Sequence, residues 1–245
     1  MSGTALPATH LLRRYLLFAL TLVFLLTMLR AGYALWQFTA VAESDALVTV
    51  FLHGLRFDLA LIGALLIVPV ILFTLMSMFS FTRGLVRFLS PLWMMLTLTF
   101  VLLVEYVTPW FMATEGVRPG LGEWSAIESP LNLLREVPQQ FPIPAAIGGV
   151  LCLLILIAFW QRLENHRLLP YPLRKFAAFF SATVGGALCV LAVWSGPIID
   201  GGNPLATSDA EISTDKTVNE LTMNTGFKVI ATAAENLLAN RSSDL

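Results

Sequence analysis

Charged residues are scarce in this chain of 245 residues: only 13% are Asp, Glu, Lys or Arg, whereas 57% are hydrophobic. Soluble domains are charged at about a quarter of their positions, so this composition argues against a soluble enzyme and favours a protein embedded in a bilayer. The 15 Lys and Arg residues against 16 Asp and Glu give a formal net charge of -1. That balance argues against a basic protein with a nucleic-acid partner.

Residues that bind metals are also few. The two cysteines, Cys152 and Cys189, fall inside apolar runs, where cysteine behaves as a small hydrophobic residue. The three histidines, His10, His53 and His166, are scattered along the chain. The sequence therefore predicts no metal site, no cofactor and no catalytic residue within this chain.

Long uncharged intervals are what the sequence does contain. A helix needs about 20 apolar residues to cross the hydrocarbon core. Intervals of this kind predict an all-α membrane protein, a bundle of five transmembrane helices at about 15–36, 59–81, 88–110, 144–161 and 176–196. Proline suits a first helical turn, so Pro142 and Pro144 place the start of the fourth helix near Ile143 to Ala145. Residues 1–14 would precede a membrane domain over 15–195, and residues 197–245 would form a linker with a helix.

The distribution of basic residues predicts the orientation, because Lys and Arg are retained in cytoplasmic loops. One side of the expected bundle carries Arg13, Arg14, Arg83, Arg87, Arg162, Arg167, Arg174 and Lys175. The opposite side, before the tail, carries only Arg30, Arg56, Arg118 and Arg135, together with several acidic residues. We therefore expect a cytoplasmic amino terminus and an extracytoplasmic carboxyl-terminal tail.

Two segments on the extracytoplasmic side have helical periodicity. Residues 123–137 place Trp124, Ile127, Leu131 and Leu134 on one face, as in an amphipathic helix lying on a membrane surface. In the tail, Thr217 to Leu238 reads as one helix with an apolar face and no obvious partner within the chain. We expect that face to pack on the membrane domain or on something carboxyl-terminal to Leu245.

Ionisable residues at membrane depth are costly and are functional candidates by default. Arg30, Arg56, Asp58 and Glu105 converge near the outer leaflet, and Arg118 follows in the next external loop. In one interpretation the opposite charges pair within the bundle, and Arg118 is a solvated loop charge. In the other, Arg56 and Arg118 bind the phosphate of an anionic phospholipid, with Arg30 nearby, while Asp58 and Glu105 orient or neutralise them. The sequence leaves both interpretations open.

Several short strings, taken in order, resemble a known family. They are Gly54-Leu55-Arg56-Phe57-Asp58 at the second span, the Glu115-to-Arg118 loop, and Asn219-Glu220-Leu221 and Asn224-Thr225-Gly226 in the tail. With five expected spans, they make the chain similar to the membrane domain of lipoteichoic acid synthase-like phosphoglycerol transferases. The resemblance implies a bacterial inner-membrane location and an extracytoplasmic catalytic domain of the alkaline phosphatase/sulfatase superfamily.

That resemblance also implies a threonine nucleophile and a divalent metal in the catalytic domain, neither of which we find in this sequence. The threonines of the tail lack the Asp, Glu and His set that such a metal site requires. We therefore expect an anchor domain of a phosphoglycerol or phosphoethanolamine transferase, not itself catalytic, whose partners are membrane lipids and the catalytic domain or another protein. The alternatives are a small transporter or channel component, and a scaffold that binds a partner through the tail helix.

Overall fold

In the computed structural model, the described residues are 10–126, 137–165, 175–193 and 205–243, and every regular element among them is helical. The long helices are α1 (His10–Trp36), α3 (Leu47–Met76) and α4 (Arg83–Thr114), followed by α7 (Pro142–Asn165) and α8 (Lys175–Val193). Shorter elements are α2 (Phe38–Glu43), α5 (Leu121–Ala126) and the 3-10 helix η1 (Thr207–Ala210). The tail forms α10 (Lys216–Thr222) and α11 (Thr225–Ser243). The expected all-α class is confirmed.

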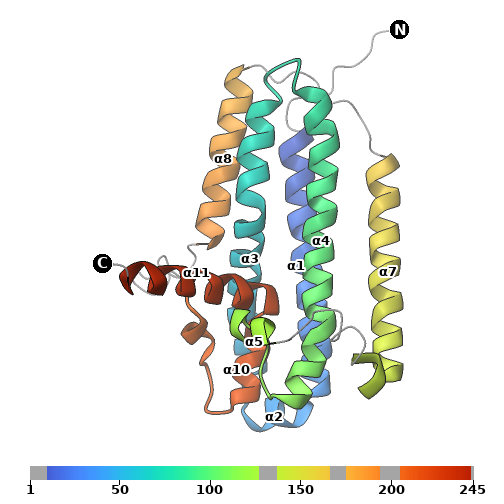
Figure 1. The fold of residues 1–245 in the computed structure, drawn as a ribbon, viewed down its shortest axis with the longest axis vertical. Coiled ribbons are helices and arrows are strands. Elements are labelled where there is room, and N and C mark those ends of the chain that lie inside the picture. Colours follow the sequence, from blue (N-terminus) through green and yellow to red (C-terminus); the bar gives the residue numbers. More distant parts are fainter. Residues whose placement is uncertain (1–9, 127–136, 166–174, 194–204, 244–245) are drawn as a thin grey trace.

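Three helices of the described part, α1, α3 and α4, are long and apolar enough to cross a membrane. They lie side by side with alternating direction, and α8 and α7 flank them (Figure 1). The apolar stretches of α7 and α8 are shorter, at Ala145–Gln161 and Ala177–Val193. The chain is thus a helical protein with membrane-spanning segments, and crossing by all five helices stays a prediction.

Helix α3 lies at the centre of the bundle, and small residues bring α8 close to it. A Cβ atom on Gly63 of α3 would lie 2.6 Å from the carbonyl oxygen of Cys189 on α8. On α8, the buried Ala178 and Ala182 and then Gly186 recur every four residues and form the matching face. Close approach through such residues replaces the hydrophobic driving force that is missing between helices in lipid.

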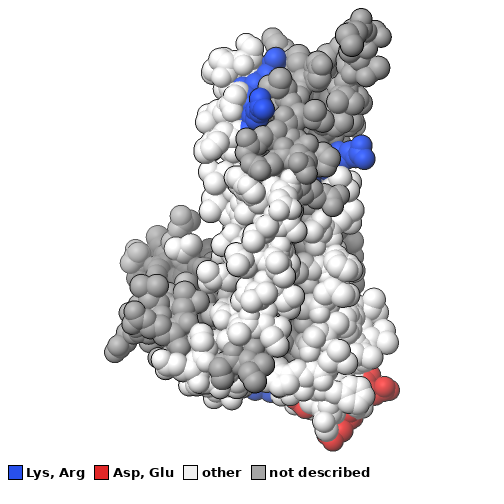
Figure 2. Space-filling model, turned by 90° about the vertical axis from the view of Figure 1, so that its right-hand side faces the viewer, with Lys and Arg blue, Asp and Glu red and all other residues white. Residues whose placement is uncertain are grey.

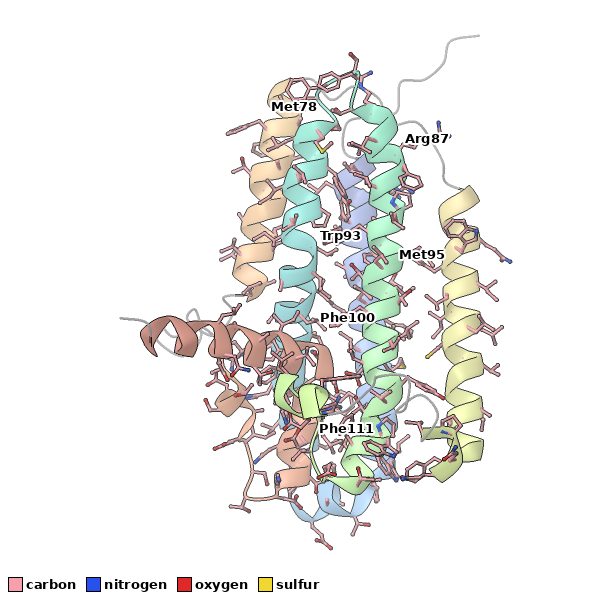
Figure 3. The ribbon with its side chains drawn as sticks, in the orientation of Figure 1. Met78, Arg87, Trp93, Met95, Phe100 and Phe111 are labelled. Carbon is pink, nitrogen blue, oxygen red and sulfur yellow. The ribbon has the colours of Figure 1, made fainter. Side chains whose placement is uncertain are left out.

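Aromatic side chains join α4 to α3, α7 and α5. Trp93 donates from its indole Nε1 to the backbone oxygen of Leu65 on α3, at 3.0 Å, and Figure 3 labels it between the two helices. On the other side, Tyr106 of α4 donates to the Ala145 oxygen of α7 at 3.2 Å. Nearer the end of α4, Phe111 packs against Trp124 of α5, with ring centroids 6.0 Å apart.

Charge separates the two ends of the bundle. On the face shown in Figure 2, most of the visible Lys and Arg lie at one end and the visible Asp and Glu at the other. We name the first the basic end, where α1 and α4 begin with Arg13, Arg14, Arg83 and Arg87, and the second the acidic end, with Glu43, Asp45 and Glu115. This asymmetry is the one on which the predicted orientation rests, and the orientation itself stays a prediction.

Two details differ from the sequence-based expectation. Helix α3 runs from Leu47 to Met76, so it begins well before residue 59 and ends before residue 81. It begins early because the helix starts directly after the turn at Asp45, with φ of 49°, and the polar residues His53 and Arg56 do not interrupt it. The tail is two helices, not one over 217–238. Met223 is extended, and Asn224 accepts from the backbone N–H of Phe227, which starts α11 anew.

Some of the remaining predictions concern described residues, and others fall outside them. The fourth helix begins at Pro142, one residue before the expected start, as proline in a first turn allows. Of the expected amphipathic segment 123–137, only the part within α5 and Val137 itself is described, and 127–136 lie outside the described residues. The basic residues Arg135, Arg167 and Arg174 also lie outside them.

Candidate functional site

The tail enters the acidic end of the bundle through the turn between α10 and α11. Val218 and Leu221 of α10 are fully buried, and Phe227 of α11 is buried against Phe57 of α3, with ring centroids 5.0 Å apart. The apolar face of the tail therefore packs on the membrane domain in the described structure. Between these contacts lie Glu220 to Thr225, all buried, and two ion pairs of the bundle close around them.

The first ion pair joins Arg30 of α1 to Asp58 of α3. The guanidinium donates through Nη1 and Nη2 to the two carboxylate oxygens, both at 2.7 Å, in a bidentate contact. Its Nη2 also donates to the Gly54 oxygen at 3.0 Å, and Nε donates to the Leu221 oxygen of the tail at 3.3 Å. Asn224 donates from Nδ2 to Asp58 at 2.9 Å. Both members of this pair therefore hold the tail.

Gly54 makes room for this arrangement. A Cβ atom at this position would overlap both Cζ and Nε of Arg30. Non-bonded carbon and nitrogen atoms repel one another at such separations, so any side chain would push the guanidinium off α3. The glycine thus lets Arg30 lie flat against the helix backbone and reach Asp58, one turn further along the same face.

The second ion pair joins Arg118, in the loop after α4, to Glu105 within α4. Nη1 donates to the Glu105 carboxylate at 3.0 Å and to Thr225 Oγ1 at 3.0 Å, while Nε donates to the Glu220 oxygen at 2.6 Å. The guanidinium carbon also lies 4.8 Å from the ring centre of Tyr33 on α1, a cation–π distance. Arg118 therefore contacts α1, α4, α10 and α11 together.

Further hydrogen bonds complete the site from the tail side. The Thr225 backbone N–H donates to Glu105 at 2.9 Å, and the Glu220 carboxylate accepts from the backbone N–H of Arg118 at 2.9 Å. Lys228 Nζ pairs with the same Glu220 carboxylate at 3.1 Å. Three cations thus face three carboxylates, and the chain segment 220–225 is bonded through side chains and backbone alike.

The charged residues of both ion pairs are buried, so their stability depends on the pairing. Arg30, Asp58, Glu105 and Arg118 are each at most 4% exposed, so each charge has lost its water and depends on protein partners. For Arg118, burial is the largest single effect and lowers the pKa, but Glu105, Tyr33 and Glu220 together outweigh it and the net pKa is raised. Arg118 therefore stays charged, and losing either member of a pair would leave an uncompensated buried charge.

The structure brings together four of the five predicted site residues in one hydrogen-bonded network. Arg30, Asp58, Glu105 and Arg118 all form hydrogen bonds with the tail. Arg118 is 2% exposed, so the interpretation of a solvated loop charge is wrong. Arg56, half-buried on α3, is not the residue that pairs with Asp58. We name the four paired residues, with Gly54 and residues 220–225, the tail-docking site.

Sequence reasoning missed the tail side of this site. The strings around Glu220 and Asn224 stood out only as parts of a resemblance, and Tyr33 and Gly54 were not singled out as partners of the charges. A usable signal was available: an Arg and an acid on neighbouring helices at one depth leave spare donors and acceptors, and such buried groups need further partners. Polar residues of the tail that lie between apolar residues can supply these hydrogen-bond partners.

Comparisons with known proteins add no assignment to this geometry. No protein-family model matches the chain, and no solved structure matches it in a structural search. Among the described residues, no cluster of three or more His, Cys, Asp or Glu side chains is arranged to hold a metal ion. The function of the chain is therefore inferred from the physical contacts of the tail-docking site.

Proposed function

We propose that the chain is a membrane anchor that holds an extracytoplasmic catalytic domain of the phosphoglycerol transferase type at a fixed height above the bilayer. The observation that supports the proposal is the tail-docking site. A flexible tether would need no buried charge, whereas here two buried ion pairs fix the tail to three helices of the bundle. Such a connection transmits position and direction to whatever the tail binds or continues into.

The positional role has a chemical reason. An enzyme that takes a headgroup from a phospholipid acts on a substrate confined to one narrow layer of the bilayer. Holding the catalytic groups at that layer converts a search in three dimensions into a local encounter, which raises the effective concentration of the substrate. In this proposal the chain supplies the placement, and the reaction and its divalent metal belong to the catalytic domain.

We also propose that anionic phospholipid contacts the arginines at this level, and of Arg30, Arg56 and Arg118 only Arg56 is partly exposed. The donors of Arg30 and Arg118 point to carboxylates and tail carbonyls, which favours a docking role for those two residues. In lipid-binding measurements on the purified chain, Arg56→Ala should weaken the binding of phosphatidylglycerol vesicles. Unchanged binding in that variant would refute the headgroup assignment.

The anchor proposal is tested on the native gene product in bacterial membranes. An amino-terminal tag would show by mass whether the product is near 26.9 kDa or much larger, which separates a free-standing module from a fused enzyme. Phosphoglycerol release from labelled phosphatidylglycerol is then measured with and without the gene. We expect transfer to fall on deletion and to return with the wild-type chain. Unchanged transfer on deletion would refute the proposal.

The transporter alternative makes a different demand on the structure. It needs ionisable groups at several depths along a path through the bundle. In the described residues, the buried charges gather instead at the acidic end, where they contact one another and the tail. This distribution is the reason for preferring an anchor.

A further inference from the structure

Helix α11 leaves the tail-docking site in an unusual direction. It runs across the bundle, whereas α3 runs along it, and it passes the end of α8 (Figure 1). Its residues 225–227 are buried and 228–233 are half-buried, but from Ala234 to Leu237 every residue is exposed, and Leu237 is 69% exposed. The exposed part is thus a helix lying across the direction of the membrane-spanning helices.

Two polar contacts fix which side of α11 faces the acidic end. Lys228 pairs with Glu220 of α10, and Thr232 Oγ1 accepts from the backbone N–H of Leu121 in α5. These residues are four apart and share one side of the helix. Both α10 and α5 lie on the acidic-end side of α11 (Figure 1). At roughly 100° per residue, Leu237 lies about 160° from this polar side and Ile230 about 180°, so both face the apolar part of the bundle.

The depth of α11 matches the surface of a bilayer. A Cβ atom on Gly226 would lie 2.8 Å from Leu61 of α3, so α11 starts beside that residue. We take Met76, the end of α3, as one boundary of the hydrocarbon core. A core about 20 residues thick then ends near Phe57, and Leu61 lies about 6 Å inside that boundary. Amphipathic helices in the membrane interface bury their apolar face by about 5–10 Å.

We propose that the side of α11 defined by Ile230 and Leu237 lies on the lipid of the leaflet at the acidic end. The occupant of this face is lipid because the face continues the apolar surface of the bundle at the same level and turns toward the hydrocarbon. Glu235 and Asn236, on the polar side, then face water. The inference goes beyond the anchor function and does not depend on it.

The experiment uses the full chain in vesicles of phosphatidylethanolamine and phosphatidylglycerol. Cysteines at 234, 235, 236 and 237 are introduced one at a time and spin-labelled, and the wild-type chain labelled in parallel gives the background from Cys152 and Cys189. Collision rates are measured with oxygen, which concentrates in lipid, and with a water-soluble nickel chelate. Asn236→Cys is the matched control for Leu237→Cys because both residues are exposed neighbours on the same helix.

We expect the oxygen-to-nickel ratio to be several-fold higher at 237 than at 236, with 234 resembling 237 and 235 resembling 236. A ratio that is equally low at all four positions would show that the face is in water and would overturn the proposal. Dipolar broadening at 237 would show that a second copy covers the face and would also overturn it. Both outcomes leave phosphoglycerol transfer, and hence the anchor proposal, unaffected.

Discussion

The side-chain hydroxyls of Thr108 and Thr225 lie 2.6 Å apart, although 117 residues separate them in the sequence. Thr108 belongs to α4 and Thr225 begins α11, so this contact directly reports tail docking. Two sulfur atoms at the same positions would approach the length of a disulfide bond, about 2.05 Å, after a small adjustment.

A cysteine pair should therefore lock the tail to the bundle. In a chain with Cys152→Ala and Cys189→Ala, we expect Thr108→Cys with Thr225→Cys to form a disulfide under mild oxidation. The measurement is the loss of reactive thiols. The control pair combines Thr108→Cys with Thr232→Cys, because Thr232 lies about 10 Å further along α11. Equal oxidation of the two pairs would contradict the docked arrangement.

The Arg30–Asp58 pair should behave as one unit in a double-mutant cycle. Arg30→Met or Asp58→Leu alone leaves a buried uncompensated charge, which costs about 3–5 kcal/mol of stability. The double variant removes both charges, so we expect it to lose less than the sum of the single losses, by about 0.5–3 kcal/mol. Unfolding in mixed micelles provides the free energies. Strict additivity would show that the two residues do not interact.

Replacing Gly54 should weaken the docking of the tail without removing any charged residue. Gly54→Ala introduces a methyl group where the Arg30 guanidinium lies, so we expect faster hydrogen exchange at the amides of residues 216–228. Gly32→Ala is the matched control on α1, because nothing lies within 4 Å of its added Cβ. That variant should be neutral or up to about 1 kcal/mol more stable. Similar exchange in both variants would refute the role of Gly54.

The α3–α8 contact should be sensitive to a single methyl group. Gly63→Ala places Cβ against the backbone oxygen of Cys189, which cannot move aside as a flexible side chain can. We expect a loss of about 1–3 kcal/mol in the free energy of unfolding in mixed micelles. Gly84→Ala, with open space around the added atom, should show no such loss. A neutral Gly63→Ala would mean that α8 does not pack as described.

The helices themselves could be predicted because apolar length is a local property of the sequence. The partner of Asp58 could not. Arg56 is closer in sequence, but residues two positions apart on a helix point about 200° apart, so Arg56 and Asp58 face different neighbours. Only the rotation of α3 against α1, set by packing around residues such as Gly54, selects Arg30. The break at Asn224 was missed because its capping role depends on Met223 leaving the helical conformation.

The bond between Arg30 and the Leu221 oxygen spans 191 residues, and it has a consequence for biogenesis. Helix α1 is synthesised early, whereas its partner Leu221 is synthesised 191 residues later. During translation Arg30 and Arg118 therefore lack their tail partners until the tail has been synthesised. Contacts between residues so distant in sequence form late in folding. A polypeptide that stops before residue 220 lacks these partners, so Arg30 and Arg118 keep only their partners within the bundle. The hydrogen-bond network of the acidic end is therefore complete only after residues 220–225 have been synthesised.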